Sequence, residues 1–210
     1  MKRTKRFLLI GIIITIVFVM GISLINKTKQ VKVSINSDQI NPDNLPGIQT
    51  GSVPWVAETD YLKERLAAIG LPVLSSEGTI LHTHEHLDIF VSGKQLTIPQ
   101  DIGINESGQF FSPIHTHDTT GIIHVESPVI QTFTLGQFFD IWGVRLTDKC
   151  IGGYCGSNTM TLRIYVNGKA VTSNFRNLVL SAHQEIVIAY GTDSQLPSSI
   201  PSSYNFPPDY

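Results

Sequence analysis

From residue 80 onward the apolar residues recur with a period of two, and this pattern constrains the fold more than any other feature of the chain. Such alternation is typical of strands that bury one face. Two segments, 87–98 and 164–172, each predict a β-hairpin, with turns at Ser92-Gly93-Lys94 and Asn167-Gly168 respectively. The chain therefore predicts a mainly β fold of antiparallel sheets, sandwich- or barrel-like, with further strands at Gly121–Glu126 and Glu185–Tyr190.

Two short helices are expected beside the strands. Apolar residues at helical spacing occupy segment 56–69, and Gly70 supplies a stop. Thr134 can cap a second helix over residues 135–142, which Gly143 ends. Neither helix carries residues that suggest chemistry.

The N-terminus has the pattern of a membrane anchor. Cationic residues at positions 2, 3, 5 and 6 precede an uncharged run from Phe7 to Ile25. As a helix this run spans roughly 28 Å, which is enough for a bilayer core. The flanking charges favour a single-pass topology in the cell membrane, with the N-terminus cytoplasmic and the C-terminal domain outside, in the periplasm or on the cell surface. The alternative is a cleaved signal peptide, which also places the body of the protein outside.

Composition divides the chain into four parts: a membrane anchor at 1–26, a flexible linker at 27–53, a His-rich β domain at 54–191, and a Ser/Pro-rich tail at 192–210. The tail aromatics Tyr204, Phe206 and Tyr210 are candidates for docking on the domain. Residues 33–210 carry 8 basic and 17 acidic side chains, a net charge of −9. A body this acidic lacks the positive surface that binds phosphates, so nucleic acid is excluded as a partner.

Cys150 and Cys155 are the two cysteines of the chain, separated by four residues that include two glycines. In an oxidising compartment this spacing favours a disulfide that closes a small loop. The alternatives are two thiolate metal ligands and a free or intermolecular pair.

Histidine is the residue type that most directly suggests a site. Six of the seven histidines fall within 43 residues, and a carboxylate follows closely. On a strand, residues i and i+2 point the same way, roughly 6.6 Å apart, so their imidazoles can converge on one ion. The candidate metal ligands are His82, His84, His86, His115, His117, His124 and Glu126.

His84, His115 and His117 are the first choices, because they sit centrally in two His-Thr-His units. Glu85 and Asp118 could also ligate, or could orient a histidine. His183 is read as an ordinary surface or core histidine. The alternative for the whole group is a hydrogen-bonded polar seam or a pH-responsive surface.

Imidazole suits Zn, Cu, Ni and Fe, whereas Ca and Mg prefer oxygen ligands. Outside the apolar N-terminal run Met160 is the only methionine besides Met1, which excludes a methionine-rich copper site. Neither cysteine lies near the histidines in sequence, as a blue-copper centre needs. The expected cofactor is a divalent transition metal, Zn or Cu(II).

Three segments together carry a resemblance: 84–88 (HEHLD), 113–127 (PIHTHDTTGIIHVES) and 133–143 (FTLGQFFDIWG). They resemble a group of uncharacterised extracytoplasmic His-rich proteins of bacteria and archaea that are often tethered by one N-terminal helix. The resemblance covers about residues 60–191. It implies a discrete domain there and no established reaction.

Three functions fit these observations. The first is a membrane-tethered extracytoplasmic metal-binding module for capture, delivery or sensing. The second is a metal-dependent enzyme with an open coordination position and Glu126 or Asp118 as general base. The third is a non-catalytic interaction domain with a structural metal, whose partner surface includes the aromatic residues Phe138, Phe139, Trp142 and Tyr165.

Overall fold

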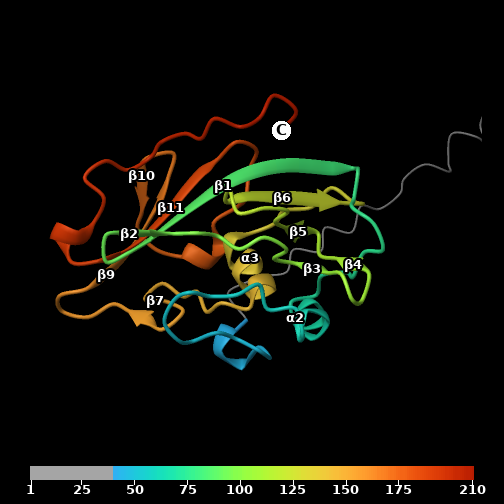
Figure 1. Ribbon diagram of the computed structural model, residues 1–210, viewed down its shortest axis with the longest axis horizontal. Helices are drawn as coiled ribbons and strands as arrows, with labels where there is room; N and C mark the ends of the chain where they lie inside the picture. Colours follow the sequence, from blue (N-terminus) through green and yellow to red (C-terminus); the bar gives the residue numbers. More distant parts are fainter. Residues whose placement is uncertain (1–39) are drawn as a thin grey trace, which may run out of the picture. The chain divides into compact units, whose positions relative to one another are not determined.

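The computed structural model describes residues 40–210, so the expected anchor at 1–26 and the first part of the expected linker lie outside the described residues. Eleven short or medium strands, two α-helices and three 3₁₀ helices make up this part of the chain (Figure 1). In chain order they are η2 (Pro42–Asn44), α2 (Leu62–Ala68), β1 (Leu81–Val91), β2 (Lys94–Leu96), β3 (Ile104–Asn105), β4 (Phe110–Phe111), β5 (Ile114–His115), β6 (Ile122–Ser127), α3 (Leu135–Trp142), β7 (Cys150–Ile151), β8 (Tyr154–Cys155), β9 (Thr161–Val166), β10 (Lys169–Val171), η3 (Phe175–Asn177), β11 (Glu185–Gly191) and η4 (Asp193–Gln195).

One seven-stranded sheet, ordered β10-β9-β11-β1-β6-β5 with β2 beside β1, forms the framework. The long strand β1 pairs antiparallel with β6 through residues 81–86 and parallel with β11 through residues 86–91. The prediction of a mainly β fold with two short helices is therefore confirmed. Most strand pairs are antiparallel, as expected, but the β1–β11 pair is parallel, so this sheet is mixed, and it is one open sheet where a sandwich- or barrel-like arrangement was expected. Alternation in a sequence fixes which side chains share a face but carries no information on strand direction.

Both predicted hairpins form with the turn geometry that their sequences favour. Ser92 and Gly93 have φ values of 51° and 81°, and Asn167 and Gly168 have φ values of 49° and 75°. Positive φ at both central residues is the type I′ turn, whose twist matches that of paired strands. The turn at 92–93 joins β1 to β2, and the turn at 167–168 joins β9 to β10.

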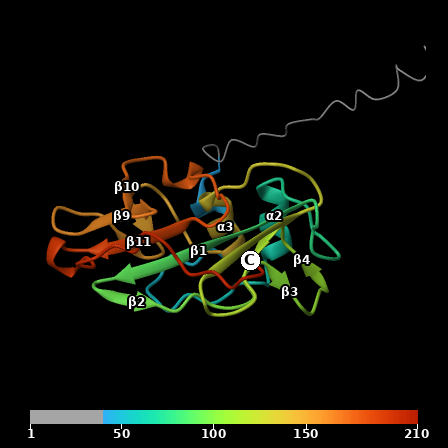
Figure 2. The same cartoon turned by 90° about the horizontal axis from the view of Figure 1, so that it is seen from above.

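Helix α3 lies against one face of the sheet, and the chain end after residue 195 crosses the other face (Figures 1 and 2). The Thr134 hydroxyl accepts a hydrogen bond from the Gln137 backbone N–H while the Gln137 side chain bonds back to Thr134 N, a complete capping box. Gly143 ends the helix at φ 75°. The helix covers Leu135–Trp142, as predicted, and all eight of its residues are buried.

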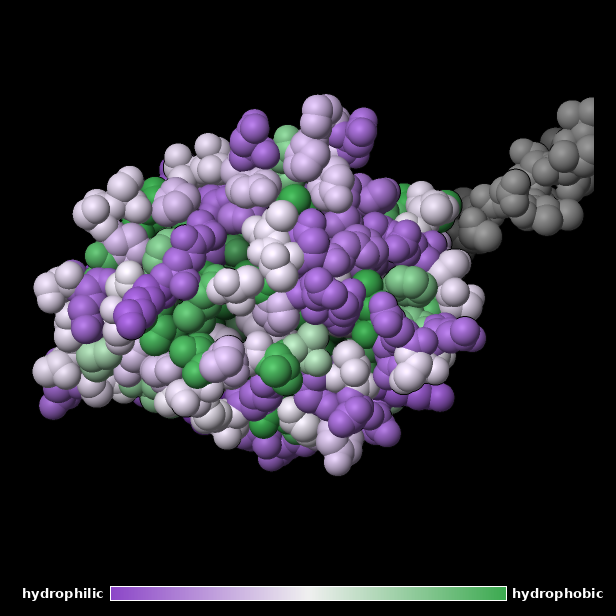
Figure 3. All heavy atoms as spheres, viewed as in Figure 1, coloured by the Kyte–Doolittle hydropathy of each residue, from purple (hydrophilic) through white to green (hydrophobic). Residues whose placement is uncertain are grey.

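The core lies between α3 and the adjacent sheet face, where Ile123 and Val125 of β6 are buried. Phe138, Phe139 and Trp142 are buried in it too, so these three do not form an exposed partner surface, whereas Tyr165 of β9 is half-buried. In the view of Figure 3, hydrophilic residues gather over β1 and β6, whereas hydrophobic residues show below β2. One face of the central strands is thus apolar and enclosed, and the other is polar.

Helix α2 is shorter than the predicted helix over 56–69. Val56 lies outside it because its backbone is engaged elsewhere: its N–H donates to the Gln49 side chain, and its carbonyl accepts from Gln49 Nε2 and Trp142 Nε1. Gln49 belongs to the segment expected as a flexible linker. In the structure this segment contacts the domain, since Leu45 is buried in the core and Gln49 forms a bridge with Val144.

Cys150 and Cys155 form the predicted disulfide, which joins β7 to β8. The alternative of two thiolate metal ligands is therefore wrong for these residues. Arg145 donates from Nε and Nη2 to the Gly152 carbonyl within the same loop.

Within residues 40–210, the helices are all too short or too polar to cross a bilayer.

The role of Thr134 as the N-terminal cap of α3 can be tested by mutation. We expect Thr134→Ala to lower the free energy of unfolding by about 1 kcal/mol, because the helix loses the acceptor for its first-turn N–H. Thr134→Ser keeps the hydroxyl and should stay close to wild type. Urea unfolding followed by the fluorescence of the buried Trp55 and Trp142 measures both variants, and equal losses in the two would contradict the capping role.

Candidate metal centre

Strand register brings the predicted ligands together on the polar face of the sheet. In the β1–β6 pair His84 lies opposite His124, and His82 lies opposite Glu126. In the β5–β6 pair His115 lies opposite the same His124. Directly opposite residues point to the same face, so three neighbouring strands present their histidines on one surface.

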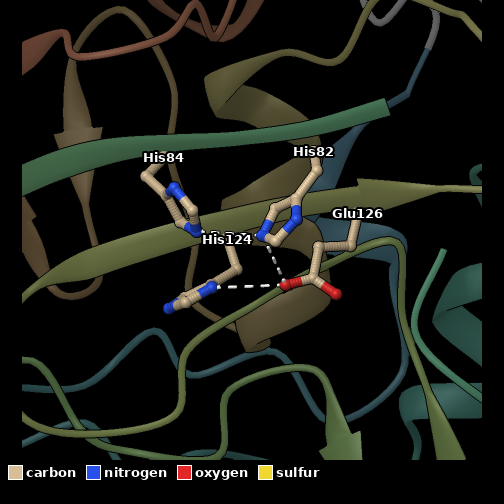
Figure 4. A group of neighbouring side chains, drawn as sticks. All are labelled: His82, His84, His124 and Glu126. Carbon is tan, nitrogen blue, oxygen red and sulfur yellow. Dashed lines mark hydrogen bonds and ion pairs between the residues drawn. The ribbon is translucent and has the colours of Figure 1, made fainter. Parts of the chain in front are cut away.

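Four side chains from β1 and β6 converge in Figure 4. The Nε2 atoms of His82 and His84 lie 3.1 Å apart. Glu126 Oε1 lies 3.2 Å from His82 Nε2 and 3.4 Å from His124 Nδ1. The four residues therefore offer three nitrogen atoms and one oxygen atom around a common point.

A second group extends the cluster past β6. The Nε2 atoms of His115 and His117 lie 3.2 Å apart, and His115 Nε2 lies 3.9 Å from Glu126 Oε1. His117 lies two residues after the end of β5, and its Nε2 lies 3.4 Å from Glu77 Oε1. His124 and Glu126 belong to both groups, and within each group the donor atoms all lie within 4.8 Å of one another.

These separations match what a transition metal requires. A tetrahedral ion with bonds of about 2.0–2.1 Å holds its donor atoms roughly 3.3 Å apart. Several donor pairs lie near that value, at 3.1–3.9 Å, and all donor atoms of a group lie within 4.8 Å of one another. Three imidazoles and one carboxylate suit Zn or Cu(II), whereas Ca and Mg prefer oxygen ligands.

The protonation states also fit a metal. Burial, assisted by the neighbouring His124 and His82, lowers the pKa of His84 to about 4. Burial likewise lowers the pKa of His115 to about 4. Both imidazoles are therefore neutral at pH 7, and a neutral imidazole is the form that ligates a metal.

Glu126 supplies the negative charge of the centre. Burial acts to raise the pKa of this carboxyl, but the proximity of His124 and the electrostatic interactions with His115 and His82 outweigh burial and hold the pKa below its ordinary value. An anionic carboxylate among imidazoles attracts a cation. The buried His124 Nδ1 has no hydrogen-bond partner, although it faces Glu126. A buried polar atom left unpaired costs about 1–3 kcal/mol, a cost that an ion bound there removes.

His86 lies apart from the other predicted ligands. Its Nδ1 lies 2.8 Å from Glu185 Oε2, and its Nε2 donates to the Thr120 carbonyl at 3.0 Å. Burial acts to lower the pKa of His86, but the hydrogen bond and charge of Glu185 outweigh it and raise the pKa. His86, Asp88 and Glu185 could also approach one ion, but both nitrogens of His86 are already engaged. The pair His86–Glu185 instead ties β1 to β11.

The other candidate carboxylates point elsewhere. Glu85 faces the opposite side of the sheet from His84, where burial raises its pKa to about 7 against the hydrogen bond from Thr83. Asp118 is exposed, and its Oδ1 accepts hydrogen bonds from the backbone and hydroxyl of Thr120. Neither residue belongs to the two groups around Glu126.

The segment after residue 195 covers part of the cluster, a role that the sequence left open. The Tyr210 ring packs against His84 and His124, with centroids 4.3 Å and 5.3 Å away. His183 holds it there by donating from Nε2 to the Tyr210 carbonyl at 3.0 Å. Tyr204 stacks flat on His86 at 3.7 Å. The aromatic residues of the tail were the only signal of this docking in the sequence.

A hollow of about 550 Å³ lies beside the second group, with His117 in its lining. Three acidic residues, Glu77, Asp101 and Glu106, line the same hollow. Sequence reasoning missed Glu77, because nothing in its local pattern separates it from an ordinary surface residue. The hollow gives a cation an acidic approach to His117.

No protein-family model matches the chain, and it has no match among curated proteins or solved structures. Function is therefore inferred from the positions and chemistry of the chain's own residues.

The lowered pKa values predict how the metal-free fold responds to acid. Because His84 and His115 titrate near pH 4 in the fold and at their ordinary 6.5 when unfolded, the unfolded chain binds more protons between these values. Their contribution to stability is complete above pH 6.5 and is lost as the pH falls toward 4. We expect His84→Gln to lose less stability than wild type between pH 7 and pH 5, measured by urea unfolding with a chelator present. An unchanged response in His84→Gln would contradict the assignment.

Proposed function

We propose that this protein is a membrane-tethered, extracytoplasmic module that binds a divalent transition metal, Zn or Cu(II), for capture, delivery or sensing. One observation carries the proposal: the histidines of three adjacent strands and Glu126 hold their donor atoms within 4.8 Å of one another in two groups. A hydrogen-bonded polar seam would also bring His82 close to His84 and His115 close to His117, as at the 3.1 Å and 3.2 Å seen between their Nε2 atoms, but it would satisfy every buried nitrogen. Here a buried nitrogen of His124 is left without a hydrogen-bond partner.

Exposure of the outer ligands favours an exchangeable ion over a purely structural one. The His82 side chain is 52% exposed and that of His117 is 38% exposed, whereas His115 and Glu126 are buried. An ion can therefore meet an outer histidine first and pass to the inner ligands. The acidic hollow beside His117 raises the local concentration of cations along this route.

Three features support a location outside the cytoplasm. The disulfide Cys150–Cys155 is of a kind that persists in oxidising compartments. The cationic and apolar N-terminal pattern fits a single-pass anchor with the domain outside. The resemblance of segments 84–88, 113–127 and 133–143 to tethered extracytoplasmic His-rich proteins agrees with both.

A metal-dependent enzyme is the second candidate, and the hollow at His117 favours it. A catalytic ion keeps a coordination position for water or substrate, and a hollow of about 550 Å³ has room for a small ligand beside such an ion. The spectrum of bound Co(II) separates the candidates. An exchangeable solvent ligand that a small anion displaces supports catalysis, and a closed set of protein ligands supports binding alone.

Metal content tests the leading proposal. We expect the full chain, purified in detergent without a His tag or chelator, to hold Zn or Cu at stoichiometric levels or to bind the added ion with micromolar or better affinity. His124→Ala removes a ligand shared by both groups and should weaken binding at least about tenfold, since even supporting residues around a metal contribute that much. Elemental mass spectrometry and calorimetry measure these quantities.

The matched control for His124→Ala is His183→Asn, which removes the one histidine outside the metal groups and the His86 pair. Asparagine is chosen because residue 183 has φ 61°, a conformation that Asn tolerates better than Ala. The control should bind metal as wild type does. A folded wild-type chain that neither contains nor binds Zn, Cu, Ni or Fe would refute the proposal.

A further inference from the structure

We propose that the cluster is a dinuclear centre, in which two ions share Glu126 as a bridging ligand. This inference rests on the proposed metal binding and extends it from one ion to two. One ion lies between His82 and His84, and the other lies between His115 and His117.

The arrangement of strands separates the histidines into two pairs. His82 and His84 come from β1, His115 and His117 come from β5 and the residues directly after it, and β6 runs between these strands. Each pair brings its two Nε2 atoms to 3.1 Å or 3.2 Å. Within residues 40–210, each group at ligand spacing around Glu126 contains one pair or the other.

A single ion would be bound by only one of the two histidine pairs. An ion held by His82 and His84, with His124 and Glu126, already has four ligands, which is the usual number for protein-bound Zn. His115 and His117, whose Nε2 atoms lie within hydrogen-bond distance at 3.2 Å, then stay outside the ligand set. A second ion uses both of these imidazoles together with the shared Glu126.

Glu126 stands where a bridging carboxylate must stand. Its Oε1 lies 3.2 Å from His82 Nε2 on one side and 3.9 Å from His115 Nε2 on the other. Both distances are to the same oxygen, Oε1, and a carboxylate oxygen has more than one lone pair, so this one oxygen can serve two ions. Ions held in this way lie about 3.5–4 Å apart, as in two-metal sites generally.

Charge makes the two binding steps unequal. Two dications against one carboxylate and neutral imidazoles leave a surplus of positive charge, so the second ion binds more weakly than the first. Surroundings differ too: the Tyr210 ring covers His84 and His124, whereas His117 faces the acidic hollow and Glu77. Glu77, 3.4 Å from His117, offsets part of the surplus on that side.

Stoichiometry tests the inference with the full chain in detergent and Zn as the titrant. Wild type should take up two ions per chain, the second at least about tenfold more weakly, as expected for like charges at this spacing. At a free-metal level that just fills the wild type, His82→Ala and His117→Ala should each hold one ion. Both side chains are substantially exposed, so neither variant threatens the fold. His183→Asn should hold two.

The number of bound ions distinguishes failure of the metal-binding function from failure of the dinuclear centre alone. No ion in the wild type overturns both the metal-binding function and this inference. One ion in the wild type, lost or weakened by either variant, keeps the function and overturns the dinuclear centre.

Magnetic coupling tests the bridge itself. Two Cu(II) ions at about 3.5–4 Å interact through a shared ligand, so the resonance signal at two equivalents should fall well below two spins per chain. His117→Ala, holding one copper, should show one full uncoupled spin. Glu126→Gln, which removes the anionic bridge with little change of shape, should lose the coupling. Two full, uncoupled spins in the wild type would overturn the bridging role of Glu126.

Discussion

The antiparallel register of β1 and β6 is the constraint on which the rest of the site depends. It sets His84 opposite His124 and His82 opposite Glu126, and β5 then adds His115 opposite the same His124. A slip of one residue turns every side chain of a strand to the other face. Such a slip would bury the histidines against α3 and expose Ile123 and Val125, so the apolar core on one face holds the ligands in place on the other.

The same division of faces explains why the sheet is open. In a sandwich, a second sheet covers the inner face of the first with apolar side chains. Here the central strands present histidines and Glu126 on one face, and an apolar layer over them would leave polar atoms without partners. The chain instead covers this face with a single extended segment whose tyrosines pack on imidazole rings: Tyr204 on His86, and Tyr210 on His84 and His124.

Much of the local structure could be predicted because it is encoded over a few residues. The positive-φ turns at 92–93 and 167–168, the Thr134 cap and the Gly143 stop all follow from short-range chemistry. The i, i+2 histidine spacing likewise predicted shared faces within β1. Long-range features could not be predicted in this way: the parallel pairing of β1 with β11, the position of Glu77, and the engagement of His86 by Glu185 depend on segments 40 to 99 residues apart.

The candidate ligands fall into a buried set and an exposed set. His84, His115, His124 and Glu126 are held by the sheet, where burial keeps His84 and His115 neutral and their charge-poor surroundings strengthen the pull of the Glu126 carboxylate. His82 and His117 are exposed to solvent. In the proposed centre the buried ligands would fix the geometry around the ion, and the exposed ligands would meet it first. A site made of both kinds suits a protein that takes up a metal and passes it on better than one that keeps a metal for its own stability.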